Sequence, residues 1–266
     1  MLQILPLLIF TLFAGASAGA AVMRLIMQPA PAKNETPLQK GESQTLYGLA
    51  FSATCIILLG IGLCGTLAHL GQPLRFINGL ANPGSGISQE AYWSIALGIL
   101  LLVEAILNFT KKKTPAPLPW ITAIAAVGLM CVTGVAYWDC LGVVAWSGAA
   151  TLPLFVLGDL ALGCAVCAVF CRNAFSEERI VWVIVAVLIA LAVVIAAFWL
   201  YLSRNGMGQT VPLALSLLIA PVLGCVVTAL GKSGKLPAQT AAISTCCLIT
   251  IGVLIARAVF FAIGMA

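Results

Sequence analysis

Eight segments of the chain are each apolar for about twenty residues, the length that an α-helix needs to cross the hydrocarbon core of a bilayer. Charged residues make up 8% of the sequence, whereas about a quarter of the residues of a soluble domain are charged. Within a bilayer the backbone cannot bond to water, so only helices and closed barrels are possible. Barrel strands alternate apolar and polar residues, and these segments do not. The sequence therefore predicts an all-α integral membrane protein with eight transmembrane helices in a single domain, 1–266.

Loops rich in proline, glycine and charge separate these segments. The expected spans are 4–27, 46–69, 91–109, 120–138, 150–171, 180–202, 211–230 and 240–263. The first span resembles a signal peptide, but its first cation, Arg24, follows the apolar run, so we expect a retained helix. A short echo between Pro6–Phe10 and Pro153–Leu157 suggests two four-helix halves repeated in parallel.

The cations fall mainly on one side of this topology. Ten lie at the first, third, fifth and seventh connections, namely Arg24, Lys33, Lys40, Lys111, Lys112, Lys113, Arg172, Arg179, Lys232 and Lys235. The other side holds Arg75 and Arg204, and Arg257 lies inside the last span. Lys and Arg in short loops stay in the cytoplasm, so both termini are expected on the opposite, periplasmic side. The net charge of +5 then reflects topology, and no nucleic-acid partner is expected.

Two observations limit the metal and haem sites that the chain can build. His69 is its one histidine, whereas a membrane b-type haem usually takes two imidazoles, so we expect no haem. Cys164, Cys167 and Cys171 share a helix face but lack a fourth partner and a loop to surround a cluster. We therefore predict no metal site, with these thiols acting as small packing residues.

His69 begins the most distinctive run of the sequence, His69-Leu70-Gly71-Gln72-Pro73-Leu74-Arg75-Phe76, and Glu90 follows where the third span starts. A neutral imidazole near the membrane surface can accept a hydroxyl proton. Gly71 and Pro73 favour a turn, and Arg75 can polarise an oxygen. The alternative is a helix-end histidine that bonds to backbone at the interface. Both interpretations stay open on the residues alone.

Two further acids, Glu104 and Asp159, fall inside predicted spans, where an unpaired charge costs a few kcal/mol. They fit either a proton path or protonated, hydrogen-bonded packing, and packing is the favoured interpretation for Glu104.

The segment from His69 to Glu90 resembles the DmsC family, the membrane anchor subunits of dimethyl sulfoxide reductases. The opening Leu5–Thr11 and the ending Ala256–Ala266 resemble the two ends of that family. Related quinol-interacting anchors of the NrfD and PsrC type share variants of the His-Leu-Gly-x-Pro-x-Arg motif.

The resemblance implies a haem-free anchor in the bacterial inner membrane, part of an anaerobic respiratory electron-transport chain. Such an anchor holds a four-cluster ferredoxin-like iron–sulfur subunit and a molybdopterin catalytic subunit, oxidises menaquinol and passes the electrons to a nearby iron–sulfur cluster. The family's catalytic histidine and carboxylate correspond to His69 and Glu90, and Gly71 and Arg75 belong to the same quinol-binding motif. The predicted topology adds Arg257 near the periplasmic end of the last span as a further quinol contact.

Three other functions are weighed against this one. One is the anchor of a different terminal reductase, of the polysulfide or nitrite type, and another is a purely structural anchor without a quinol site. The third is a small-solute transporter. Pro153, Pro212 and Pro221 are compatible with the broken helices of transporters, but the sequence suggests few paired charges at the midplane.

Overall fold

The computed structural model describes residues 4–27, 37–69, 80–112, 114–171, 175, 177–208 and 210–265, and side-chain surroundings for all of these except 37–45, 69 and 210. Eight helical spans are long and apolar enough to cross a membrane, so the predicted all-α architecture is confirmed. The helices are α1 (Ile4–Ile26), α2 (Pro37–His69), α4 (Gly86–Phe109), α5 (Pro117–Trp138), α6 (Thr151–Phe170), α7 (Glu178–Arg204), α8 (Thr210–Leu217), η3 (Leu218–Leu223), α9 (Gly224–Lys232) and α10 (Ala238–Gly264).

Two helices begin earlier than hydropathy predicts. Helix α2 starts at Pro37 instead of residue 46, with proline in the first turn, where its missing N–H costs nothing. Helix α4 starts at Gly86 instead of residue 91. Hydropathy did not include its first turn because that turn contains polar residues. Glu90 therefore lies within α4, one turn from its beginning, and not ahead of it.

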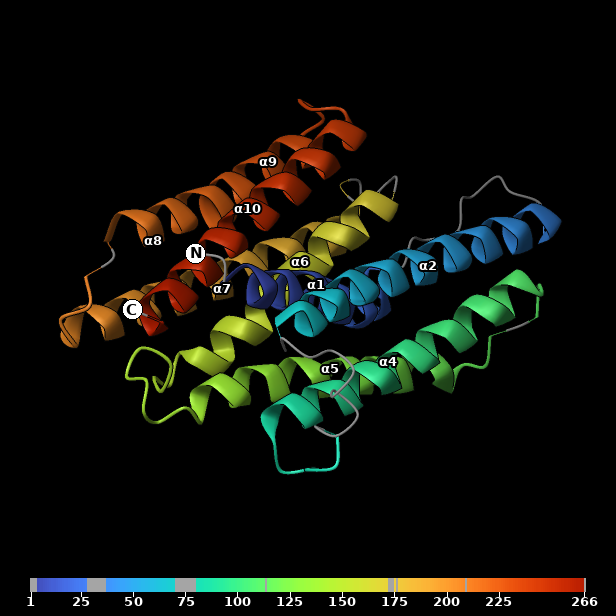
Figure 1. The fold of residues 1–266 in the computed structure, drawn as a ribbon. Coiled ribbons are helices and arrows are strands. Elements are labelled where there is room, and N and C mark those ends of the chain that lie inside the picture. The colour runs from blue at the N-terminus through green and yellow to red at the C-terminus, as the bar shows by residue number, and fades with distance from the viewer. Residues whose placement is uncertain are drawn as a thin grey trace.

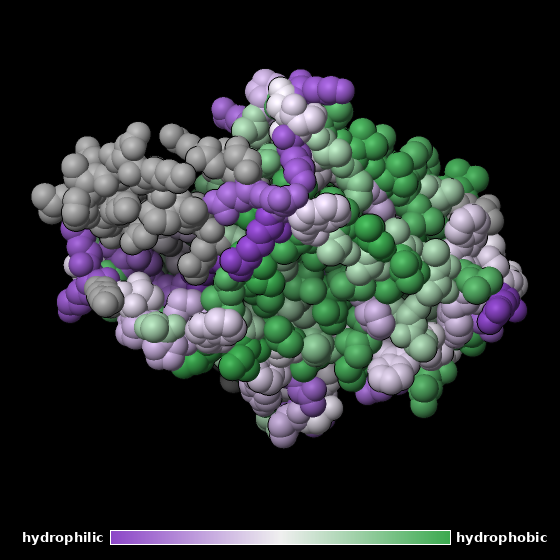
Figure 2. Space-filling view, turned by 180° about the vertical axis from the view of Figure 1, so that it is seen from behind, coloured by the Kyte–Doolittle hydropathy of each residue, from purple (hydrophilic) through white to green (hydrophobic). Residues whose placement is uncertain are grey.

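The helices run roughly lengthwise through one bundle, and both chain termini lie toward the same side in Figure 1. We name this the termini end, where α1 begins at Ile4 and α10 ends at Gly264. The opposite end is where α1 ends and α10 begins. Figure 2 shows a broad apolar surface across the middle of the molecule, with most hydrophilic side chains toward its ends. That distribution is typical of a transmembrane bundle whose apolar middle is surrounded by lipid.

Helix contacts follow the same pattern in the first and second sets of four spans. In the first set, α1 packs on α2, α2 on α4, α4 on α5, and α5 returns to α1. In the second set, α6 packs on α7, α7 on the α8–α9 span, that span on α10, and α10 returns to α6. Helices α1 and α6 pack against each other where the two sets meet.

Glycines bring α1 and α6 into backbone contact. A Cβ atom on Gly163 would lie 2.1 Å from the carbonyl carbon of Gly19, and one on Gly19 would lie 1.8 Å from the carbonyl oxygen of Asp159. A Cβ on Gly15 would lie 1.9 Å from Asp159 Oδ1. Small residues are the usual means of close helix approach in lipid, where apolar side chains gain little from leaving the bilayer. Here they also make room for an acidic side chain.

A buried carboxylate connects all four helices of the first set. Glu104 of α4 accepts two bonds from the Arg24 guanidinium of α1, Nη1 to Oε2 at 2.5 Å and Nη2 to Oε1 at 2.9 Å. Thr122 of α5 donates to Glu104 Oε1 at 2.6 Å, and Ser52 of α2 donates to Oε2 at 3.5 Å. Arg24 also lies over the ring of Phe51, 5.1 Å from its centroid. Arg24 lies in the last turn of α1, at the helix end where the count of cations placed it, but its pairing with Glu104 keeps it inside the bundle.

The seventh span is not one continuous α-helix. Between α8 and α9 the chain forms η3, a π-helical segment that contains Pro221. A proline inside an α-helix removes one backbone hydrogen bond and clashes with the preceding turn. The wider π-helical turn accommodates it, so the span continues to α9.

We expect Gly163→Ala to destabilise the protein by about 1–3 kcal/mol or more, because the added methyl group would overlap the backbone of α1. Thermal unfolding of the purified protein in detergent measures the loss. Gly60→Ala in α2 is the matched control, since its Cβ would meet no atom within 4 Å. Equal midpoints for the two variants would contradict the close crossing.

Candidate functional site

Glu90 differs from the other acids that the structure describes within the spans. Glu104, Asp159 and Glu178 each pair with a cation, at 2.5 Å, 2.5 Å and 3.0 Å. The Oε1 atom of Glu90 is shielded from solvent and has no hydrogen-bond partner among the described residues. Leaving a buried polar atom unpaired is costly, so such an atom is a candidate for contact with a ligand.

Among the described residues, two hydroxyl side chains of α5 interact with Glu90. Thr133 lies close enough for its hydroxyl group to interact with the carboxyl group, and Tyr137, one helical turn further, interacts with it electrostatically. At Gly86 the first turn of α4 lies so near α5 that a Cβ would be 3.0 Å from the Cβ of Ala136. Helices α4 and α5 therefore hold a carboxyl and two hydroxyl side chains together at the termini end.

The ring of Tyr137 packs against a cluster of aromatic side chains. This ring stacks on Phe155 at 5.1 Å and 16°, and meets Phe260 and Phe261 edge-on at 5.6 and 5.2 Å. Trp146, from the connection between α5 and α6, stacks on Phe260 and donates its indole N–H to the Phe260 carbonyl oxygen at 2.9 Å. The cluster joins α5, α6 and α10 and fixes the plane of the Tyr137 ring.

Arg257, expected near a quinol, lies inside the protein with 2% of its surface exposed. Its Nη2 donates to Asp159 Oδ1 at 2.5 Å and to the Phe155 carbonyl oxygen at 3.3 Å. Its Nη1 donates to the carbonyl oxygen of Thr11 in α1. Both terminal nitrogens of the guanidinium are therefore bonded to α6 and α1, and its Nε is buried without a hydrogen-bond partner among the described residues. The sequence suggested few paired charges at the midplane, and the structure shows two buried ion pairs between the spans, this one and Arg24–Glu104.

Arg257 is nevertheless connected to the Glu90 region through the aromatic rings. Its guanidinium carbon lies over the ring of Phe155, 4.7 Å from the centroid, on which Tyr137 also stacks. A cation over an aromatic face is electrostatically attracted to it. The Asp159–Arg257 pair thus fixes Phe155, which supports Tyr137 beside Glu90.

The remaining predicted site residues are only partly described. His69 is the last residue of α2, at the termini end, where α4 begins, so its backbone and Glu90 lie at the same end of the bundle. The side chain of His69, and Gly71 and Arg75, lie outside the described residues.

Sequence reasoning missed Thr133, Tyr137 and Phe155. The spacing of Thr133 and Tyr137 puts their side chains on one face of α5, which is a detectable signal. Phe155 carries no such signal, because its role depends on contacts with α5 and α10.

The cysteines of α6 contact α1 at the opposite end of the bundle. The Cys171 thiol donates to the Met27 carbonyl oxygen at 3.0 Å, and the Cys167 thiol to that of Ala20 at 3.7 Å. Among the described residues, no three metal-binding side chains come together. These thiols contribute to the packing of α6 on α1.

Removing one member of the Asp159–Arg257 pair should cost more stability than the loss of that residue's own contacts, because the partner charge stays buried without its counter-charge. Arg257→Met leaves a buried carboxylate unpaired, at about 3–5 kcal/mol, and Asp159→Asn leaves a buried guanidinium unpaired. The double variant should lose clearly less than the sum of the two. Thermal unfolding in detergent measures all three.

Lys232→Gln is the control for this cycle, because it removes a solvent-exposed pair with Glu178 at 3.0 Å and should cost about 0–1 kcal/mol. Additive losses in the Asp159 and Arg257 variants would show that the two charges do not depend on each other.

The family model described as DMSO reductase anchor subunit (DmsC) matches residues 1–209. The match includes Glu90, Thr133, Tyr137, Phe155 and Asp159, and ends ahead of Arg257. None of the curated proteins compared with the chain matches it. Since the match covers well over half of the 266 residues, the chain belongs to the DmsC family of DMSO reductase anchor subunits.

Proposed function

We propose that this anchor subunit binds menaquinol at the termini end of the bundle, between the end of α2 and the start of α4, and oxidises it there. The observation that carries the proposal is the Glu90 carboxyl, the one described acid within the spans that lacks a cationic partner. A carboxyl with a free, shielded oxygen is suited to accept a proton from a hydroxyl group.

His69 supplies the second proton acceptor in this proposal. Oxidation of a quinol to a quinone releases two protons and two electrons. His69 accepts the proton of one hydroxyl group and Glu90 the proton of the other. Both electrons pass to an iron–sulfur cluster of a partner subunit, which delivers them to the molybdopterin subunit. Gly71 and Arg75 shape and polarise the site by virtue of the same motif, and no haem takes part.

The loop cations support an orientation for this chemistry. Most of the charged loops lie at the opposite end of the bundle, so by the positive-inside rule that end faces the cytoplasm of a bacterial inner membrane. The termini end then faces the periplasm, where the protons are released and the partner subunits dock. The matching helix contacts of the two sets of four spans support two halves repeated in parallel.

Arg257 acts as a positioning residue here. Its bonds to Asp159 and to the carbonyl oxygen of Thr11 argue against direct contact with a quinol oxygen. It instead holds Phe155, and through that ring Tyr137, beside Glu90.

We expect Glu90→Gln and His69→Ala each to lower menaquinol-dependent reduction by the assembled complex by about 10²-fold or more, because each removes a proton acceptor. Turnover with a short-chain menaquinol measures the effect. Activity with a soluble donor that reduces the partner subunits directly should stay unchanged, which shows that the complex is assembled.

Glu178→Gln is the control, since this exposed carboxylate lies at the opposite end and pairs only with groups near the surface. If both Glu90→Gln and His69→Ala assembled normally and oxidised menaquinol at the wild-type rate, the proposed quinol site would be contradicted. A purely structural anchor would then be the better interpretation.

A further inference from the structure

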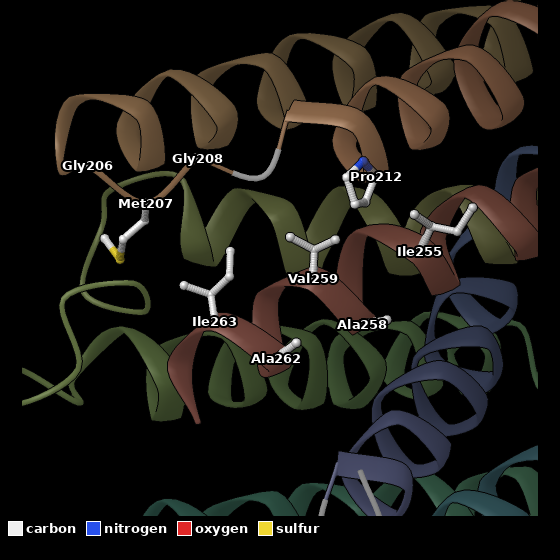
Figure 3. A pocket seen from close by; sticks show the side chains of 9 residues that line it. All are labelled: Gly206, Met207, Gly208, Pro212, Ile255, Ala258, Val259, Ala262 and Ile263. Atoms are coloured by element: carbon white, nitrogen blue, oxygen red, sulfur yellow. The ribbon is translucent and has the colours of Figure 1, made fainter. Parts of the chain in front are cut away.

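A cavity of about 630 Å³ lies in the second half of the molecule, between α10, the start of α8 and the connection from α7. Figure 3 shows Met207, Pro212, Ile255, Val259 and Ile263 around it. Glycine and alanine form the rest of the described lining, and none of these described side chains carries a charge or a hydroxyl, amide or ring N–H group. The volume is in the range of sites that hold small organic ligands.

The cavity is separate from the Glu90 region. Ile255, Val259 and Ile263 follow the helical repeat, so they share one face of α10. Arg257, Phe260 and Phe261 are buried and pack instead toward α6 and Tyr137. Helix α10 itself therefore lies between the two regions.

An exposed cation, Arg204, lies close in sequence to the cavity lining. Arg204 is the last helical residue of α7, two residues before Gly206, which lines the cavity and turns the chain with a φ of 73°. Its side chain is exposed and forms no ion pair with any part of the chain that the structure describes. A guanidinium at the membrane surface is well suited to bind a phosphate group.

We propose that this cavity holds one acyl chain of an anionic phospholipid whose phosphate binds Arg204. The apolar side chains of the described lining match a hydrocarbon chain, and the charge of Arg204, two residues before Gly206, matches the headgroup. The small residues Ala258 and Ala262 leave the space that the chain fills.

A comparison with the equivalent positions of α5 in the first half shows why the cavity suits a lipid better than a second quinol. Helix α10 completes its ring of four helices as α5 completes the other. Val259 and Ile263 stand at the same distances from the end of α10 as Thr133 and Tyr137 from the end of α5. Aliphatic side chains thus stand where α5 carries hydroxyl groups, and none of the described lining side chains can accept a quinol proton.

The test uses the full-length protein in phosphatidylglycerol vesicles that contain a phosphatidylglycerol with a photoreactive group at the end of one acyl chain. Peptide mass spectrometry then maps the labelled residues. We expect preferential labelling of 206–212 and 255–263. Ala262→Phe, which fills the cavity, should lower this labelling at least about fivefold, and Arg204→Gln should lower it about threefold.

Two matched variants serve as controls. Ala197→Phe places the same ring on an exposed position of α7 outside the cavity, and Arg179→Gln removes an exposed cation at the other end of α7. Both should label as the wild type does. Uniform labelling of all lipid-facing helices, or labelling indifferent to Ala262→Phe, would overturn the proposal. So would labelling of this cavity by a photoreactive menaquinone in preference to the lipid. Each of these results leaves the role of Glu90 to be decided separately.

Discussion

A charge inside a lipid-embedded bundle has to find its counter-charge within the protein, and the Asp159–Arg257 pair meets this requirement where the two halves join. The Asp159 carboxylate fits only because position 15 of α1 carries no side chain. Its partner Arg257 binds a carbonyl oxygen of α1 and lies over Phe155. The helix crossing, the union of the halves and the support of Tyr137 thus depend on one ion pair.

The second buried pair, Arg24–Glu104, connects helices within the first half only. Glu104 joins Arg24, Ser52 and Thr122, so a single carboxylate connects the four helices of the first half near the opposite end of the bundle. Glu90 belongs to the same helix, α4, about four turns away, and has no cationic partner among the described residues. Helix α4 is therefore held at one end and presents an unneutralised acid at the other. Such a division suits a site whose carboxyl group has to change its protonation state.

The sequence was sufficient to predict eight spans, because unbroken apolar length is a direct consequence of bilayer thickness. It was insufficient at the polar helix ends: hydropathy excluded the first turns of α2 and α4, which are helical although polar. The family motif predicts Glu90 as a site residue, and the structure shows one of its oxygens buried without a hydrogen-bond partner among the described residues, but neither of the buried pairs could be foreseen. Arg24 and Glu104 are 80 residues apart, and Asp159 and Arg257 98 residues, so only the packing of the helices brings them together. Arg24 in particular has the sequence position of a cation at a helix end and the environment of a core residue.

The π-helical segment η3 has a consequence for how the seventh span can change in evolution. Relative to an uninterrupted α-helix, a π-helical turn accommodates one extra residue, and each residue turns an α-helix by about 100°. The faces of α8 and α9 are therefore out of phase, and the side of α8 that contains Pro212 shares the cavity with α10. Loss of one residue within 218–223 would rotate α8 as a unit and leave its own helical turns intact. A single insertion or deletion there can exchange the whole set of side chains that α8 presents to its neighbours.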